Sequence, residues 1–112
     1  HQSELPMYYN VADITVLPSL WDEPAGLTMI ESMSCGTPVI TTSQGGIPEY
    51  VKDGALIVQV DDDIEENIAK GIEFLLSEES DYENKCNCSM AIVQENFSPE
   101  KYLENFYAII KE

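Results

Sequence analysis

Residues 14–42 decide the fold of this chain, and they read ITVLPSLWDEPAGLTMIESMSCGTPVITT. The stretch opens with a β-branched run at 14–17, which predicts a short buried strand because a proline follows it at once. Residues 27–35 predict a helix, and Gly36 supplies the left-handed turn that ends it. The next β-branched run, at 39–42, predicts a second strand. A strand, a helix and a second strand in this order indicate two parallel neighbouring strands.

The predicted helix at 27–35 is amphipathic. Its apolar residues are Leu27, Ile30 and Met33, with Met29 beside them. At helical spacing such residues form a stripe that packs on the core, so we expect these side chains to be buried.

The segments on either side of this stretch extend the same pattern. Before and after it we predict a short helix at 4–12 with Pro6 in its first turn, a turn at 43–46, a helical turn around 48–51 and a strand at 55–60. Three helices follow. The first has Ile64, Ile68, Ile72 and Leu75 on one face, the second spans 81–95, and the last is capped by Ser98 and Pro99 and turns Tyr102, Phe106 and Ile109 or Ile110 inward. Strands separated by helices predict an α/β fold with a Rossmann-like parallel sheet and flanking helices. Three strands are few for such a sheet, so the fold looks incomplete on its N-terminal side.

Composition and charge limit the possible partners. The chain has 112 residues, 44% of them hydrophobic, which predicts one globular domain over residues 1–112. Five Lys and no Arg stand against 21 Asp and Glu, a formal net charge of −16. Phosphate backbones and anionic membranes need a basic surface, so nucleic acid is excluded and membrane docking is disfavoured. We expect a cytoplasmic protein, because neither a membrane span nor a signal-peptide layout is found.

Cysteines and acidic runs give weak signals for metal. Cys35, Cys86 and Cys88 lack zinc-like pairing, which favours reduced thiols in a cytosolic protein. The run Asp61–Asp63 precedes a predicted helix, where acidic side chains cap the helix and complement its dipole. Metal binding by this run is the alternative. We favour the capping role and expect no metal site.

The loop before the helix at 27–35 is the candidate ligand site. In open parallel sheets, ligands bind beyond the carboxyl ends of strands, where helix N-termini present free amide groups. Gly26 lets the backbone approach a ligand closely, and the amides of Gly26, Leu27 and Thr28 suit a diphosphate. Five residues of helix rise about 7.5 Å, so Glu31 could reach a ribose whose phosphates sit at the helix start.

A second carboxylate, Glu23, precedes the helix on the other side of the phosphate site. It could bond the hydroxyls of a transferred sugar, or stabilise positive charge at the anomeric carbon. The alternatives are that Glu23 only complements the helix dipole and that Glu31 is a solvated helix position. Spacing alone does not decide between them.

The wider pattern closely resembles the retaining glycosyltransferases of the large family 4, over residues 4–60. The resemblance rests on a Glu-x7-Glu element and the segments around it. These segments are YNVADI (9–14), EPAGLTMIE (23–31), SMSCGTPVITT (32–42) and GGIPE (45–49).

The resemblance implies a two-domain GT-B fold, of which this chain would be the last part of the C-terminal, donor-binding domain, with the N-terminal acceptor domain absent. By that analogy Glu23 contacts the donor sugar, Gly26, Leu27 and Thr28 bind the diphosphate, and Glu31 holds the ribose. The donor would be a nucleoside diphosphate sugar, UDP- or GDP-linked, transferred with retention and without a metal or other cofactor. The acceptor would be a glycan or a lipid-linked molecule of surface polysaccharide or glycoconjugate synthesis, and membrane contact would come only through absent regions.

Three departures from the family pattern matter, and one of them is that a Gly often found between Asp53-Gly54 and the third strand is absent. Ala25 stands where an aromatic residue is usual, so packing on the donor sugar differs. The basic residues that neutralise the diphosphate in the family come from upstream, so we expect this chain alone to be inactive. Two other functions stay open, a nucleotide-sugar 2-epimerase and a non-catalytic binding module derived from GT-B. Tyr8 and Tyr9 are predicted to be core or domain-interface residues.

Overall fold

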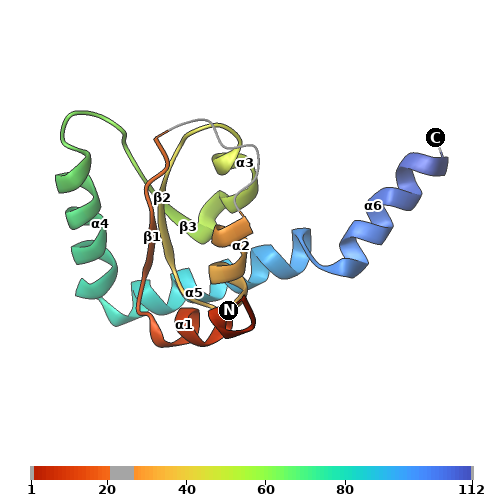
Figure 1. The fold of residues 1–112 in the computed structure, drawn as a ribbon, viewed down its shortest axis with the longest axis horizontal. Helices are drawn as coiled ribbons and strands as arrows, with labels where there is room; N and C mark the ends of the chain where they lie inside the picture. The colour runs from red at the N-terminus through yellow and green to blue at the C-terminus, as the bar shows by residue number, and fades with distance from the viewer. Residues whose placement is uncertain (1, 21–26, 112) are drawn as a thin grey trace.

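Three parallel strands form one sheet in the order β1-β2-β3 (Figure 1). The computed structural model describes residues 2–20 and 27–111. The register pairs Val16 with Ile40 and Ile40 with Leu56. The elements are η1 (Gln2–Glu4), α1 (Leu5–Val11), β1 (Thr15–Leu17), α2 (Leu27–Ser34), β2 (Val39–Thr42), α3 (Ile47–Val51), η2 (Lys52–Gly54), β3 (Ala55–Val58), α4 (Ile64–Ser77), α5 (Glu79–Asn96) and α6 (Pro99–Lys111). The predicted α/β fold with a parallel sheet is therefore confirmed, and β3 is two residues shorter than expected.

The sheet separates two hydrophobic clusters, because successive side chains of a strand point to opposite faces. The face covered by α2, α3 and α5 buries Met29, Met33, Val39, Ile47, Val51 and Ala55. The other face buries Ile40, Val58 and Leu75, against which the predicted isoleucine stripe of α4 packs. Figure 1 shows α4 on one side of the strands and α2 on the other.

The buried face of α2 differs from the predicted one. Met29, Ser32 and Met33 are buried, whereas Leu27 is 69% exposed. Ser32 can occupy the buried face because its hydroxyl lies 2.8 Å from Thr15 Oγ1 and 3.1 Å from the backbone oxygen of Thr37. A satisfied polar group costs little to bury. Counting apolar residues alone therefore assigned the wrong face to Leu27.

The end of α2 confirms the predicted glycine stop. Gly36 has a φ of +77°, in the left-handed region that favours glycine. The backbone N–H of Gly36 donates to Met33, and that of Thr37 donates to Ser32. These two bonds satisfy carbonyls that would otherwise lack a partner at the helix end. The turn leads the chain directly into β2.

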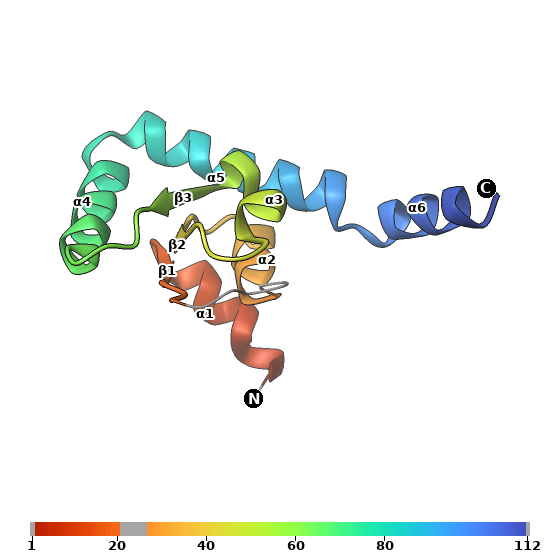
Figure 2. The same cartoon turned by 90° about the horizontal axis from the view of Figure 1, so that it is seen from above.

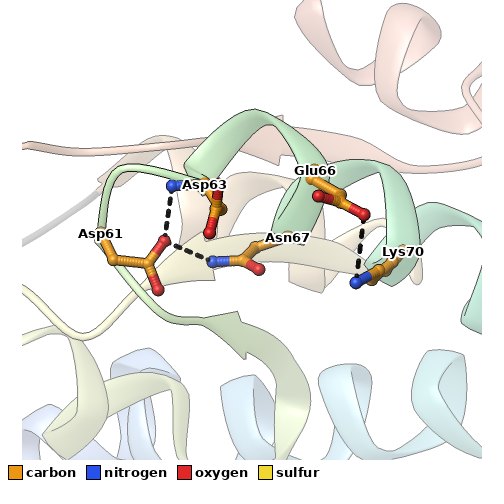
Figure 3. Close-up of polar contacts among 5 residues, drawn as sticks. All are labelled: Asp61, Asp63, Glu66, Asn67 and Lys70. Atoms are coloured by element: carbon orange, nitrogen blue, oxygen red, sulfur yellow. Dashed lines mark hydrogen bonds and ion pairs between the residues drawn. The ribbon is translucent and has the colours of Figure 1, made fainter.

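The acidic run forms the turn that leads into α4, whose N-cap residue is Asp63 (Figure 3). Asp61 Oδ1 accepts a hydrogen bond from the Asp63 backbone N–H at 2.8 Å and one from Asn67 Nδ2 at 3.1 Å. The run precedes α4 as predicted, but the N-cap residue Asp63 makes no side-chain bond to a helix amide, so the capping role stays a prediction. Figure 3 also shows the exposed Glu66–Lys70 ion pair one turn further on. Within 2–20 and 27–111, no group of three or more His, Cys, Asp or Glu side chains is arranged to hold a metal ion.

Helix α5 crosses one end of the sheet and makes a close contact with η2. The buried Ser89 hydroxyl donates to the backbone oxygen of Gly54 at 2.6 Å. A β-carbon on Gly54 would lie only 2.5 Å from Met33 Cε and 3.3 Å from the Ser89 Cα. The helix backbone can come this near because position 54 has no side chain.

Helix α6 extends away from the rest of the molecule (Figures 1 and 2). Its start is capped as predicted, since the Lys101 backbone N–H donates to Ser98 Oγ. The predicted inward face is wrong for Phe106, which is 48% exposed, and for Ile109, which is 72% exposed. The side chains of Tyr102 and Ile110 lie outside the described part. An amphipathic pattern predicts a face that can be buried, and in the described chain only the end of α5 adjoins α6.

None of the helices in the described residues combines the length and the apolar character needed to cross a bilayer.

Candidate functional site

The first turn of α2 is the end of that helix nearer the carboxyl ends of the strands, the side on which a parallel sheet binds its ligands. Leu27 and Thr28 occupy this turn, and both are exposed. The first four N–H groups of a helix have no partner inside the helix, and the helix dipole favours an anion there. The structure therefore places two of the predicted diphosphate-binding residues at an exposed helix start.

Buried threonines of β2 fix the chain where it leaves β1. The Thr41 hydroxyl donates to the backbone oxygen of Leu17 at 2.9 Å, and the Thr42 hydroxyl donates to that of Ser19 at 2.7 Å. These bonds add side-chain anchors to the ladder between the strands. They hold the segment that leads from β1 toward the start of α2.

Glu31 lies one turn further along α2 and is half-buried. The Tyr9 hydroxyl, on α1, donates to Glu31 Oε2 at 3.2 Å across 22 residues of sequence. A carboxylate offers about four acceptor positions, so this one bond leaves capacity for further donors such as sugar hydroxyls. The alternative of a merely solvated Glu31 does not describe this environment.

An open pocket of about 240 Å³ lies beside Glu31, lined by Leu5, Pro6, Tyr9, Glu31, Ser34 and Cys35. Pockets that enclose a whole small-molecule ligand are typically about 300–1,000 Å³, so this one has room for part of a nucleotide. Its lining combines apolar surface from α1 with polar atoms from α2. Figure 2 shows the two helices side by side.

Burial raises the pKa of the Tyr9 hydroxyl above its ordinary value of 10.0, and the neighbouring Glu31 charge raises it further. Tyr9 is therefore protonated at neutral pH and available as a donor to Glu31.

Sequence reasoning did not find the contact between Tyr9 and Glu31. Tyr9 was predicted to be a core or interface residue, and it is half-buried, whereas its neighbour Tyr8 is 62% exposed. No spacing rule relates residues 22 positions apart on two helices. Both lie in the segments that carry the family resemblance, which was the only available signal.

Three of the residues singled out from sequence, Glu23, Ala25 and Gly26, lie outside the described residues. Their assigned roles stay predictions.

The lysine side chains that the structure describes are engaged elsewhere. Lys52 donates to Asn96, Lys85 donates to the backbone oxygen of Asp53, and Lys70 and Lys101 form exposed ion pairs on their own helices. None of these side chains lines the pocket beside Glu31. Within the described part of the chain, an anion at the start of α2 would therefore meet helix amides rather than these lysine side chains.

Comparison with known proteins identifies the family. Residues 1–89 match the family model described as glycosyl transferases group 1. The chain is 45% identical over 60 residues to the D-inositol 3-phosphate glycosyltransferase of Thermobifida fusca (strain YX), a match that covers 54% of this chain and 14% of that protein. It is 28% identical over 110 residues to spore coat protein SA of Bacillus subtilis (strain 168), covering 97% of this chain and 29% of that protein.

The fold has a solved counterpart in the sucrose-phosphate synthase of Thermosynechococcus elongatus. The two superpose with a TM-score of 0.78 at 29% identity, over 93% of this chain and 26% of that one. The chain thus spans less than a third of the length of these relatives. The match over residues 1–89, together with this GT-B counterpart, shows that the chain belongs to the group 1 glycosyl transferases.

Proposed function

We propose that this chain is the donor-binding part of a retaining family 4 glycosyltransferase and forms the last part of its C-terminal domain. The enzyme transfers a hexosyl group from a nucleoside diphosphate sugar, UDP- or GDP-linked, to a glycan or lipid-linked acceptor. The observation that carries the proposal is the half-buried Glu31 carboxylate, bonded by Tyr9 and one turn from the exposed start of α2.

The spacing along α2 fits a nucleotide. Leu27 and Glu31 are four residues apart, which is about 6 Å along the helix axis. A diphosphate on the amides of Leu27 and Thr28 would leave the attached ribose level with the Glu31 carboxylate. Vicinal hydroxyls are good donors to a carboxylate, so this arrangement favours a nucleotide over free phosphate.

Chemistry at the sugar falls to Glu23. In a front-face substitution the diphosphate leaves from the same face that the acceptor enters, which retains the anomeric configuration. Glu23 bonds the donor sugar and stabilises the positive charge that develops at the anomeric carbon. No metal takes part. The net charge of −16 opposes a dianionic leaving group, so cations from the longer protein complete the site, and this chain alone is inactive.

The biological task is the synthesis of a surface polysaccharide or glycoconjugate in the cytoplasm, with contact to the inner face of the membrane made by other parts of the protein. Similarity to named glycosyltransferases supports the transfer of a sugar. Our proposal leaves the donor base and the acceptor to experiment.

The test uses the full-length protein and two alanine variants. Glu23→Ala should lower the rate of sugar transfer at least tenfold, or about 1.4 kcal/mol of transition-state stabilisation. Glu31→Ala should weaken binding of the matching nucleotide by about 1–3 kcal/mol, because a charged acceptor is lost. Titration with UDP, GDP and ADP identifies the base.

The matched control is Glu65→Ala, an exposed glutamate in the first turn of α4. This variant removes the same charge from the far side of the sheet. It should leave both the rate of sugar transfer and the affinity for the nucleotide unchanged. Unaltered transfer by the Glu23→Ala protein, or unaltered nucleotide affinity after Glu31→Ala, would remove the corresponding residue from the site.

A further inference from the structure

We propose that Tyr9 is a positioning residue, whose hydroxyl holds the Glu31 carboxylate in the orientation that receives the nucleotide's ribose. The proposal rests on the proposed function, because it assigns Tyr9 a role through Glu31. The two residues come from different helices, and their oxygens lie 3.2 Å apart. Both line the pocket beside α2.

Tyr9 is suited to this role because its own position is fixed. The Thr37 hydroxyl donates to the Tyr9 backbone oxygen at 2.5 Å, which ties α1 to the turn that ends α2. Thr37 is buried, and its backbone N–H is already engaged in that turn. The donor that reaches Glu31 is thus anchored to the same helix that carries Glu31.

A fixed carboxylate binds better than a free one. A glutamate side chain loses rotational freedom when a ligand fixes it, and this loss opposes binding. When Tyr9 already restrains Glu31, less freedom remains to be lost on binding. Burial and the Glu31 charge raise the pKa of Tyr9, so its hydroxyl stays protonated at neutral pH.

A purely structural role for Tyr9 makes a different prediction. If Tyr9 only packs α1 on α2, its aromatic ring matters and its hydroxyl does not. Tyr9→Phe keeps the ring and removes the hydroxyl. The adjacent Tyr8, 62% exposed on the same helix, offers the identical substitution as a control.

The experiment is a double-mutant cycle on the full-length protein, with the affinity for UDP, GDP or ADP measured by calorimetry. Tyr9→Phe should weaken nucleotide binding about three- to tenfold. This effect is small for the loss of a hydrogen bond to a charged group, because the 3.2 Å between the Tyr9 hydroxyl and Glu31 Oε2 is long for an O–H donor. Tyr8→Phe should change nothing. In the Glu31→Ala background, Tyr9→Phe should have no further effect.

The outcomes separate this proposal from the proposed function. A loss for Glu31→Ala with none for Tyr9→Phe overturns the positioning role alone. A Tyr9→Phe loss that persists in the Glu31→Ala background also overturns it, since Tyr9 would then act without Glu31. Unchanged binding in both single variants overturns the positioning role and the ribose role of Glu31 together.

Should Tyr9→Phe fold poorly, Glu31→Asp supplies a second measurement. The shorter side chain keeps its charge but draws the carboxylate back from Tyr9. It should weaken nucleotide binding by a similar three- to tenfold, and an unchanged affinity would overturn the positioning role.

Discussion

Replacing Gly54 with alanine should lower the free energy of unfolding by about 1–2 kcal/mol, because α5 packs too close to accommodate a side chain. The new β-carbon would lie 2.5 Å from Met33 Cε and 3.1 Å from Ile92 Cδ1. These side chains could shift, but the β-carbon would also meet the Ser89 Cα at 3.3 Å, which is backbone. The helix must therefore move, and the buried bond from Ser89 to Gly54 lengthens.

The magnitude combines two opposing effects. Overpacking a core typically costs about 1–3 kcal/mol. Alanine also restricts the unfolded chain, which returns about 0.4–1 kcal/mol of stability. The net loss corresponds to a fall of roughly 4–8 °C in the unfolding temperature of a domain this size. Thermal melts followed by circular dichroism, with urea titrations to verify an unchanged m-value, measure it.

Gly71→Ala is the matched control, since Gly71 is also buried but lies inside α4. Its β-carbon would approach the terminal methyl Leu56 Cδ2 at 3.2 Å, which a small side-chain rotation relieves, and no other atom within 3.4 Å. Alanine gains about 1 kcal/mol of helix propensity over glycine. The midpoint temperature of thermal unfolding should therefore stay constant or rise for Gly71→Ala. An unchanged midpoint for Gly54→Ala, or an equal fall for both variants, would refute the close contact between α5 and η2.

Three further predictions concern the turn before α4, a tyrosine on α5 and the last helix. Asp61→Ala should lower the free energy of unfolding in urea by about 0.5–1.5 kcal/mol, because its hydrogen bonds to Asp63 and Asn67 are lost. Asp62→Ala, exposed in the same run, should change it by less than about 0.5 kcal/mol. Tyr82→Phe should lower it by about 0.5–1 kcal/mol, because the hydroxyl donates to the backbone oxygen of Asp13 at 2.6 Å. Burial raises the pKa of Tyr82 above 10.0. The stability that the neutral hydroxyl contributes is therefore present below pH 10 and is lost as pH rises through the folded-state pKa. The unfolding temperature of Tyr82→Phe should accordingly depend less on pH above 10 than that of the unmodified protein. Truncation after residue 97 should shift the unfolding temperature of the remaining chain by no more than about 2 °C. In the intact chain, amide hydrogen exchange should be far faster in α6 than in β2. Strong protection of the α6 amides would contradict its exposed placement.

Local patterns in the sequence were sufficient for most of the fold. Strands β1 and β2 are short β-branched runs bounded by proline and glycine, and the turn at Gly36 requires its positive φ. The capping residue Ser98 gave a correct helix start, and the acidic run at 61–63 directly precedes α4 as predicted. These signals act within a few residues, so they can be recognised without knowing what packs where.

The burial of helix faces was less predictable, because it depends on partners distant in sequence. Ser32 is buried because Thr15 lies beside it across 17 residues, which apolar periodicity does not reveal. Phe106 and Ile109 have helical spacing but are exposed. An amphipathic pattern shows that a face can be buried and does not show what covers it.

The structure describes where part of the candidate site lies, and the roles of its residues stay predictions. Leu27 and Thr28 form the exposed start of α2, and Glu31 follows one turn later, as the motif predicted. Glu23 and Gly26 stay predictions. The contact of Glu31 with Tyr9 arises from the packing of two helices and has no local signature in the sequence.

The division of the core by the sheet has a consequence for how the protein can change. Among the described residues, no side chain belongs to both buried clusters. Substitutions that share no contacts contribute additively to stability. Substitutions that improve packing around Ile64, Ile68 and Ile72 can therefore stabilise the α4 side of the sheet. The geometry around Glu31 then stays as it is. A protein built in this way can gain tolerance to mutation on one face and vary the residues around Glu31 on the other.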